Sequence, residues 1–236
     1  MTAQDLRTAR RGRGWTQHEA AERLGLSQSY VAMLESGSRK FTPALARRAR
    51  HVFSLSPTVL PPSRILPTPP GKEPPQALAE DLAALGYPGF SYLRSRRRKR
   101  NPGEVLLTAL AQDHLEARLA EALPWLLVRY WDTDPNWLVE QAKLHDLQNR
   151  TGFVVTLARQ WAERMPHDQK RVGALQELER NLERSLLARE EAFGKGSFSP
   201  SELAWLRVNR SEDAKRWNLL TNWTVENLSY ASQPNP

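Results

Sequence analysis

The stretch TQHEAAERLGLSQSYVAMLESG, residues 16–37, decides how the first part of this chain folds. Thr16 and Glu19 have the spacing of a capping box, in which each side chain satisfies a backbone amide at a helix start. Gly25 supplies the positive φ that a tight turn needs, and Ser27 can cap the helix that follows. We therefore expect two short helices joined by a turn of three residues.

Two helices joined in this way form a helix-turn-helix motif, whose second helix lies in the major groove of DNA. The apolar residues of the stretch are spaced to form a small core between the helices: Ala21, Leu24, Leu26, Val31 and Leu34. The N-terminal side of the second helix carries our candidate base contacts: Gln28, Ser29, Ala32 and Met33. A glutamine amide can form two hydrogen bonds with adenine in the major groove.

Together with its flanks, about residues 5–56, this stretch resembles the Xre/Cro/C1 family of helix-turn-helix regulators. The matching features are Leu6-Arg7, Arg10, Thr16-Gln17, Leu24-Gly25-Leu26-Ser27, and Glu35 followed by Gly37. The resemblance implies a five-helix, lambda-repressor-like domain at residues 1–60 that binds double-stranded DNA. The chain departs from the family pattern at Ala20, where leucine is usual, and at Phe41, where proline is common.

The resemblance also implies roles for single residues. Gln17 would bind a DNA phosphate, Gln28 and Ser29 would face bases, and Arg39 and Lys40 would face the DNA backbone. Arg10 and Arg13 complete our candidate contacts to the DNA backbone. The alternative is a helical protein–protein module that has lost DNA binding, but the retained glutamines and cations favour DNA.

The charge of the chain is unevenly distributed. Residues 1–60 carry ten Lys or Arg against four Asp or Glu, and residues 61–100 carry eight against three. Residues 101–236 carry sixteen Lys or Arg against nineteen Asp or Glu. A basic front part predicts contact with a polyanion, although charge alone does not separate DNA from RNA or an anionic membrane.

A proline-rich segment follows the predicted first domain. Seven of the fifteen residues at 61–75 are proline, which has a fixed φ and no amide donor, so we expect a stiff extended linker. We assign residues 61–101 to this linker, with a short helix at residues 76–85. Its last part carries a run of cations: Arg94, Arg96, Arg97, Arg98, Lys99 and Arg100. We interpret this run as an auxiliary nucleic-acid contact, and the alternative is a solvated loop.

The rest of the chain, residues 102–232, is predicted to be an all-α domain for dimerisation or partner binding. Apolar residues at 107–126 recur at steps of three or four, the period of one helix face. An Asp-Pro pair predicts the start of a helix over residues 134–149, and a further long helix is expected at residues 166–193. No segment alternates with period two for long, so the whole chain is assigned to the all-α class.

Residues 122–163 also resemble the C-terminal part of regulators encoded beside nucleotidyltransferase-type toxins. The resemblance rests on Pro124-Trp125, on a DxxWL-like stretch, and on the string HDLQNR at residues 145–150. It implies an antitoxin region that binds a toxin. The candidate partner surface consists of Trp137, His145, Gln148 and Asn149.

Several chemistries have no pattern in this sequence. The chain has no cysteine, which excludes disulfides and cysteine-ligated zinc, and its five histidines lack metal-ligand spacing. No Ser-His-Asp set or carboxylate pair is recognisable, so we expect no enzyme activity, metal or cofactor. No apolar run approaches the roughly 20 residues of a membrane span, and the first residues lack the apolar centre of a signal peptide. We therefore expect a cytoplasmic protein without a membrane partner.

These patterns together predict a sequence-specific DNA-binding transcriptional regulator, acting as a dimeric repressor. Its two half-sites are expected about one turn of DNA apart, roughly 34–36 Å. The main alternative is an antitoxin, whose second half neutralises a toxin while its first half regulates its own operon. RNA binding also stays open because the arginine run would suit RNA, and an enzyme ranks last.

Overall fold

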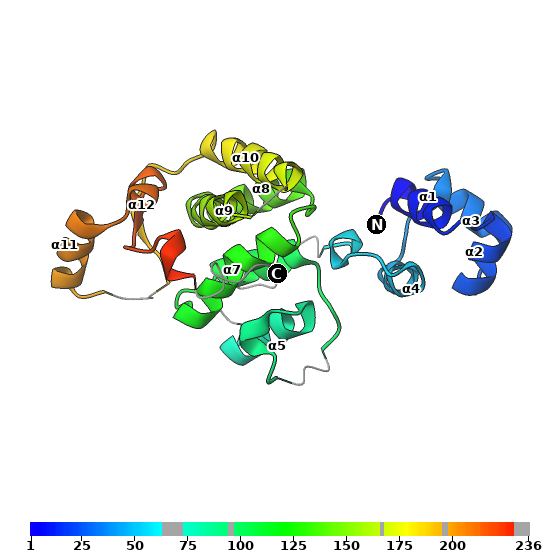
Figure 1. Cartoon of the computed structure of the whole chain (residues 1–236), viewed down its shortest axis with the longest axis horizontal. Helices are drawn as coiled ribbons and strands as arrows, with labels where there is room; N and C mark the ends of the chain where they lie inside the picture. Colours follow the sequence, from blue (N-terminus) through cyan, green and yellow to red (C-terminus); the bar gives the residue numbers. More distant parts are fainter. Residues whose placement is uncertain (63–72, 94–96, 166–167, 195–197, 229–236) are drawn as a thin grey trace. The chain divides into compact units, whose positions relative to one another are not determined.

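The computed structural model describes residues 1–62, 73–93, 97–165, 168–194 and 198–228. The chain divides into two compact units, Met1–Pro62 and Ser63–Pro236. We call them the N-terminal unit and the C-terminal unit and describe each by itself. Helices dominate both (Figure 1), and strands within the described residues amount to two segments of two residues each. The prediction of an all-α protein is confirmed.

The N-terminal unit contains four α-helices and one turn of 3-10 helix. In chain order these are α1 (Ala3–Gly12), α2 (Gln17–Leu24), α3 (Gln28–Glu35), α4 (Pro43–Phe53) and η1 (Pro57–Val59). Each α-helix begins after a Thr or Ser whose side chain accepts a backbone hydrogen bond from the first turn: Thr2, Thr16, Ser27 and Thr42. The fifth helix expected from the sequence is thus a single turn.

The core of the N-terminal unit is small and lies between these helices. Ala21, Leu24, Val31 and Leu34 are buried as expected, and Leu26 packs against them half-buried. Apolar burial of this kind is the main force that holds two short helices at a fixed crossing, because helices of eight residues are not stable alone.

The C-terminal unit contains eight α-helices among its described residues, together with two short strands and two 3-10 turns. In chain order these are α5 (Pro75–Leu85), η2 (Pro88–Phe90), α6 (Pro102–Leu110), α7 (Ala117–Arg129), α8 (Pro135–Leu144), α9 (Gln148–Glu163), α10 (Gln169–Glu183), β1 (Glu191–Ala192), α11 (Pro200–Asn209), α12 (Glu212–Arg216), β2 (Leu219–Leu220) and η3 (Val225–Asn227). The strands β1 and β2 pair in parallel. Within the described residues, no helix is both long and apolar enough to cross a membrane.

Helix α9 is the centre of the C-terminal unit. It packs against α7 and α10, and twelve of its sixteen residues are buried. Gly152 lies against the ring of the fully buried Trp217, so a side chain at this position would overlap the indole. The Trp217 Nε1–H donates to Thr156 Oγ1 at 2.8 Å, which satisfies the indole inside the core.

Two predicted helices of the second half have other boundaries in the structure. The helix expected over residues 134–149 is interrupted, because α8 ends at Leu144 and Asp146 adopts a positive φ of 56° before α9 begins. The helix expected over residues 166–193 ends at Glu183, and Glu191–Ala192 forms β1 instead. Residues 166–167 lie outside the described residues. The period of apolar residues does not reveal where one helix ends and the next begins, because the apolar residues in and around the turn still follow the helical spacing.

The segment assigned to a linker at residues 61–101 differs most from the expectation. Residues 63–72 lie outside the described residues, but α5 belongs to the main core of the C-terminal unit. Leu78, Leu82 and Leu85 are buried along one face of α5, and the Tyr130 hydroxyl donates to the Leu85 carbonyl oxygen at 2.6 Å. The many prolines next to this helix indicate a linker, whereas the apolar face of the helix packs into the core.

Candidate DNA-reading surface

The turn between α2 and α3 has the geometry that its sequence predicts. Thr16 and Glu19 form the expected capping box at the start of α2. Gly25 ends α2 with a φ of 62°, and the Ser27 side chain accepts a hydrogen bond from the Tyr30 amide to start α3. The two helices of the motif are therefore held at a defined angle by local backbone chemistry as well as by their shared core.

Helix α3 presents two different faces. Val31 and Leu34 are fully buried on the core side, whereas Gln28 and Ser29 are exposed at the N-terminal end. Ala32 and Met33, one turn further on, are half-buried. The structure thus places the four candidate base contacts outside the core of this unit, and their role toward DNA stays a prediction.

Glu35 at the end of α3 holds three helices together. Its carboxylate is buried, with 2% of the side chain exposed, and accepts hydrogen bonds from Arg10 Nε at 2.6 Å and Arg10 Nη2 at 3.0 Å. Gln17 Nε2 donates to the same carboxylate at 2.9 Å. The backbone carbonyl of Glu35 accepts from Arg7 Nη2 at 2.8 Å. Bidentate arginine contacts of this kind are strong and directional, so they fix α3 against α1 and α2.

The pKa of the Glu35 carboxyl reports how well this cluster suits a negative charge. Burial alone would raise that pKa, but the hydrogen bonds from Arg10 and Gln17 outweigh burial and hold it below the ordinary value of 4.5. The hydrogen bond to Glu35 raises the pKa of Arg10 in turn. In the sequence, Glu35 stands out only as a feature of the family, because its partner Arg10 lies 25 positions away and no local pattern links the two.

The structure changes the interpretation of the candidate contacts to the DNA backbone. All three guanidinium nitrogens of Arg10 donate inside the unit, two to Glu35 and the third, Nη1, to the Trp15 carbonyl oxygen at 2.8 Å. Three of the five N–H donors of Arg10 are therefore used inside the unit, and its contact with a DNA phosphate stays a prediction. Gln17 uses one amide hydrogen for Glu35, and Arg13 Nη2 donates to the Phe53 carbonyl oxygen at 3.2 Å. These two keep part of their donor capacity.

Two candidate backbone contacts lie where a duplex could reach them. Arg39 and Lys40 follow α3 and are exposed. Within residues 1–62, the structure shows no hydrogen bond or ion pair from either side chain. They are the cations of the N-terminal unit whose position after the reading helix best fits phosphate contact.

The arginine run of the predicted linker is largely engaged within the C-terminal unit. Arg97 Nε lies 3.0 Å from Asp81 Oδ1, and Arg100 Nη1 lies 2.8 Å from Asp81 Oδ2. Arg100 also contacts Glu73 at 3.1 Å and Glu104 at 2.9 Å. These carboxylates already pair with Arg97 and Arg100 inside the fold, which leaves fewer of their donors for phosphate, and their contact with nucleic acid stays a prediction. Arg98 and Lys99 are exposed, and Arg94 and Arg96 lie outside the described residues.

Two of the four residues of the predicted partner surface around the string HDLQNR are buried. Gln148 is 5% exposed and Asn149 is fully buried. Asn149 donates to the Leu187 carbonyl oxygen at 3.0 Å and accepts from the Leu187 amide at 2.9 Å, so it anchors the chain after α10. Trp137 and His145 are half-buried. A polar residue on a helix can thus be buried and hydrogen-bonded within the fold, and the sequence alone does not show this.

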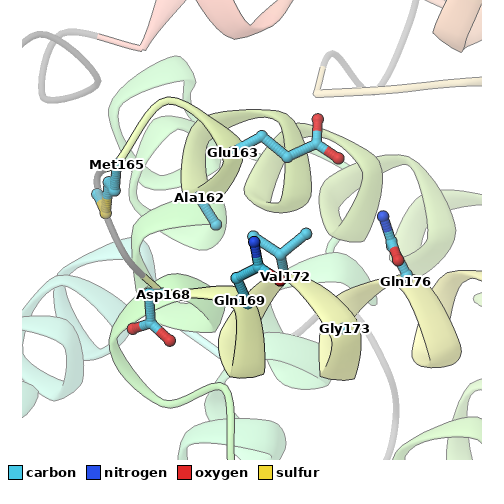
Figure 2. Close-up of a pocket in the computed structure, with 8 residues that line it drawn as sticks. All are labelled: Ala162, Glu163, Met165, Asp168, Gln169, Val172, Gly173 and Gln176. Carbon is cyan, nitrogen blue, oxygen red and sulfur yellow. The ribbon is translucent and has the colours of Figure 1, made fainter.

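A groove of the C-terminal unit carries acidic side chains that are already paired. One groove of about 840 Å³ lies between the end of α9 and the start of α10 (Figure 2). Figure 2 shows the carboxylates of Glu163 and Asp168 pointing in different directions, and each is paired with an arginine, Arg159 at 2.7 Å and Arg171 at 2.9 Å. No cluster of three His, Asp or Glu side chains suited to a metal ion occurs among the described residues.

The comparisons with known proteins agree with the geometry of the N-terminal unit. A capped helix, a glycine turn and a second helix with an exposed N-terminal face define a helix-turn-helix domain. Residues 6–60 match the family model described as Helix-turn-helix, so this quarter of the chain is an Xre/Cro/C1-type domain of a DNA-binding regulator. No curated protein and no solved structure matches the chain. The antitoxin resemblance of residues 122–163 gains no support.

Proposed function

We propose that this protein is a sequence-specific transcriptional repressor that binds duplex DNA as a homodimer, in the cytoplasm. The observation that carries the proposal is the exposure of Gln28 and Ser29 at the N-terminal end of α3, the second helix of the motif. That end of the second helix is the part that reaches base edges in proteins of this class.

The proposed readout divides the work between bases and phosphates. Gln28 donates to N7 and accepts from N6 of an adenine, and Ser29 adds one hydrogen bond to a neighbouring base. Met33 and Ala32 offer apolar atoms to a thymine methyl group. Arg39 and Lys40 bind phosphates, which sets the register of α3 without adding sequence information.

The Glu35 cluster supplies the rigidity that such readout needs. A bidentate contact between a side chain and a base discriminates only when the helix that carries it is held in place. Arg10 and Gln17 reach Glu35 from α1 and α2, so the position of α3 is set from two sides. In this proposal Arg10 and Glu35 are positioning residues and do not touch DNA.

A dimer follows from the size of the reading surface. A single module of this kind buries about 600–1,000 Å² of protein surface on DNA, less than most selective complexes. Two copies on half-sites about one helical turn apart would double the contacts and read a palindromic operator. Such a complex represses by occupying the DNA that RNA polymerase requires.

The test begins with selection of bound duplexes from a random pool by the full chain. We expect an enriched palindromic motif, and Gln28→Ala should then cost about 1–3 kcal/mol of binding free energy on that motif and relax its preference at one base position. Gln4→Ala is the matched control, because Gln4 is an exposed glutamine of the same unit that lies on α1. No enriched motif, or equal losses for both variants, would refute sequence reading by α3.

The alternatives predict other outcomes of the same experiment. RNA binding predicts that a duplex RNA of the same sequence competes as well as DNA, which the deep and narrow major groove of A-form RNA disfavours for an inserted helix. The antitoxin alternative is less well supported, because two residues of its candidate partner surface, Gln148 and Asn149, are buried.

A further inference from the structure

The C-terminal unit contains a pocket at the start of α7. Its volume is about 460 Å³, inside the range of roughly 300–1,000 Å³ in which proteins bind small molecules. Segments far apart in the chain form it: the first turn of α7, the residues after β1, the buried side of α11 and the residues around β2. It shares no residue with the groove between α9 and α10, so it is a separate site.

Three aromatic rings line this pocket. Phe193 is 6% exposed, and its ring stands edge to face against the ring of Trp223, with the two ring centroids 6.1 Å apart. Phe198 is the third ring and is half-buried, and the buried Leu220 adds an aliphatic surface. Rings pack well against other rings in edge-to-face and offset arrangements, so this lining favours an aromatic ligand.

The walls of the pocket are held in place by contacts within the fold. The Leu115 amide donates to the Gly194 carbonyl oxygen at 2.7 Å, which joins the residues before α7 to those after β1. Phe193 also packs against Phe153 of α9, with ring centroids 5.2 Å apart. Helix α11 contributes the buried Leu206, while the apolar residues of its opposite face stay exposed. A pocket formed in advance lowers the entropy cost of binding a ligand.

The polar part of the lining lies mainly at the first turn of α7. No side chain of the described residues caps this helix, so the amides at its start have no side-chain acceptor. Glu116 is exposed, and within the described residues its carboxylate takes part in no hydrogen bond or ion pair. His114, Thr221 and Asn222 complete the polar lining. The turn therefore offers both N–H donors and a carboxylate acceptor.

The two kinds of group at this turn select against a charged ligand. The carboxylate of Glu116 repels an anion, whereas the positive end of the α7 dipole disfavours a cation. An uncharged hydroxyl can donate its hydrogen to the carboxylate and accept a hydrogen bond from an amide at the same time. A polar group of this kind uses both features of the turn.

We propose that this pocket binds a small, uncharged aromatic molecule that carries a hydroxyl or a similar group that both donates and accepts. The ring of the ligand lies among Phe193, Phe198 and Trp223, and its polar group lies at the first turn of α7. Binding needs only residues of the C-terminal unit, so it is independent of DNA reading by α3.

The first experiment measures binding of 2-naphthol to the full chain by equilibrium dialysis. We expect saturable binding of one molecule per chain. Ala117→Trp should weaken it at least about tenfold, because Ala117 is exposed in the first turn of α7 and a large side chain there fills the pocket. Ala44→Trp is the matched control, since Ala44 is likewise exposed in the first turn of a helix but lies on α4.

A second filling variant separates a blocked pocket from a disturbed helix. Asn222→Trp enters from the residues after β2, where Asn222 is exposed, and should weaken binding in the same way without touching α7. Thermal unfolding of each variant shows whether its fold is kept. No saturable binding of 2-naphthol to the unchanged chain would overturn the proposal, and so would undiminished binding by the two folded filling variants.

The second experiment tests the charge of the ligand. The probes 2-naphthoate and 2-naphthylmethylammonium carry the same ring with a negative or a positive group, and we expect both to bind more weakly than 2-naphthol. Glu116→Gln removes the repulsion and should bring the affinity for 2-naphthoate closer to that for 2-naphthol. The control Glu140→Gln, at an exposed position on α8, should not. Tighter binding of either ion than of 2-naphthol by the unchanged chain would refute an uncharged ligand.

Discussion

The two units of this protein each bury a carboxylate among arginines, with opposite results. In the N-terminal unit, Arg10 and Gln17 hold the pKa of Glu35 below its ordinary value. In the C-terminal unit, burial raises the pKa of Asp81 above 3.8, although Arg100 and Arg97 act against burial. The side chains of both carboxylates are at most 2% exposed.

Burial is the largest cause of the raised pKa of Asp81, and the neighbouring carboxylate of Glu73 adds to it. Glu35 receives three hydrogen bonds and has no acidic neighbour in its cluster. Asp81 shares Arg100 with Glu73 and Glu104, so three carboxylates compete for few cations. A buried ion pair stabilises a fold only when its hydrogen bonds replace the lost water. The comparison indicates that Glu35 holds α3 rigidly against α1 and α2. The cluster around Asp81 mainly neutralises the charges of Arg97 and Arg100.

The largest expected effect is the loss of the Glu35 charge. Glu35→Gln leaves Arg10 buried without its counter-ion and should lower the stability of the N-terminal unit by about 3–5 kcal/mol. Hydrogen exchange of amides in Met1–Pro62 of the full chain measures this, with Glu22→Gln as control. Glu22 is exposed and pairs only with His18 on its own helix, so its loss should be within about 0.5 kcal/mol. Equal effects would contradict the comparison.

A smaller effect is expected at Asp81. Asp81→Asn removes a charge that burial already disfavours, and Arg100 keeps Glu73 and Glu104 as partners. The stability of the C-terminal unit, measured by hydrogen exchange in the full chain, should change by less than about 1 kcal/mol. A loss as large as that of Glu35→Gln would show that the two clusters do not differ.

The pH dependence of the two variants should have opposite signs. The contribution of Glu35 is complete above its unfolded pKa near 4.5 and is lost as pH falls through its lower folded pKa. The gap in stability between the unchanged chain and Glu35→Gln should therefore narrow in acid. The contribution of Asp81 is complete below 3.8 and is lost as pH rises through its higher folded pKa. Relative to Asp81→Asn, the unchanged chain should thus gain stability in acid.

These signs can be measured by following hydrogen exchange in each unit at several pH values, always as the difference between the unchanged chain and its variant. Other acidic groups titrate in both proteins and cancel in the difference. If the stability difference changed with pH in the same direction for both variants, the two clusters would not differ in the way proposed.

The smallest effect concerns nucleic-acid affinity near the cluster of Asp81. If Arg98, which is exposed, contacts phosphate, Arg98→Ala should reduce the slope of log affinity against log salt by about 0.9. Arg97→Ala should leave the slope unchanged, because Arg97 is paired with Asp81. Titrations of the full chain on its selected operator at several salt concentrations measure both. If Arg97→Ala also reduced the slope of log affinity against log salt, Arg97 would have to contact DNA.

The same contrast shows which parts of the site could be predicted. Thr16, Gly25 and Ser27 predict the turn correctly. A helix cap or a positive φ depends only on residues within four positions of each other, so it can be read from the local sequence. The exposed position of Gln28 followed from the same local pattern. The pairing of Arg10 with Glu35 spans 25 positions and depends on how α1 packs against α3, so no local rule predicts it.

Errors in the second half have a related cause. Arg97, Arg100, Gln148 and Asn149 were assigned to surfaces because charged and polar residues are usually exposed. In the structure Arg97 and Arg100 form ion pairs inside the fold, Asn149 is a hydrogen-bond anchor, and Gln148 is buried. Composition describes the average environment of a residue type, whereas these positions depend on partners from distant segments.

The sequence by itself determined the all-α class, the helix-turn-helix of the N-terminal unit and the starts of most helices, because hydrophobic period and capping act over one or two turns. Only the tertiary structure decided which arginines are free, which polar residues are buried and which apolar face, that of α11, is left uncovered. These outcomes depend on contacts between residues far apart in the chain, whose geometry exists only after the helices have packed.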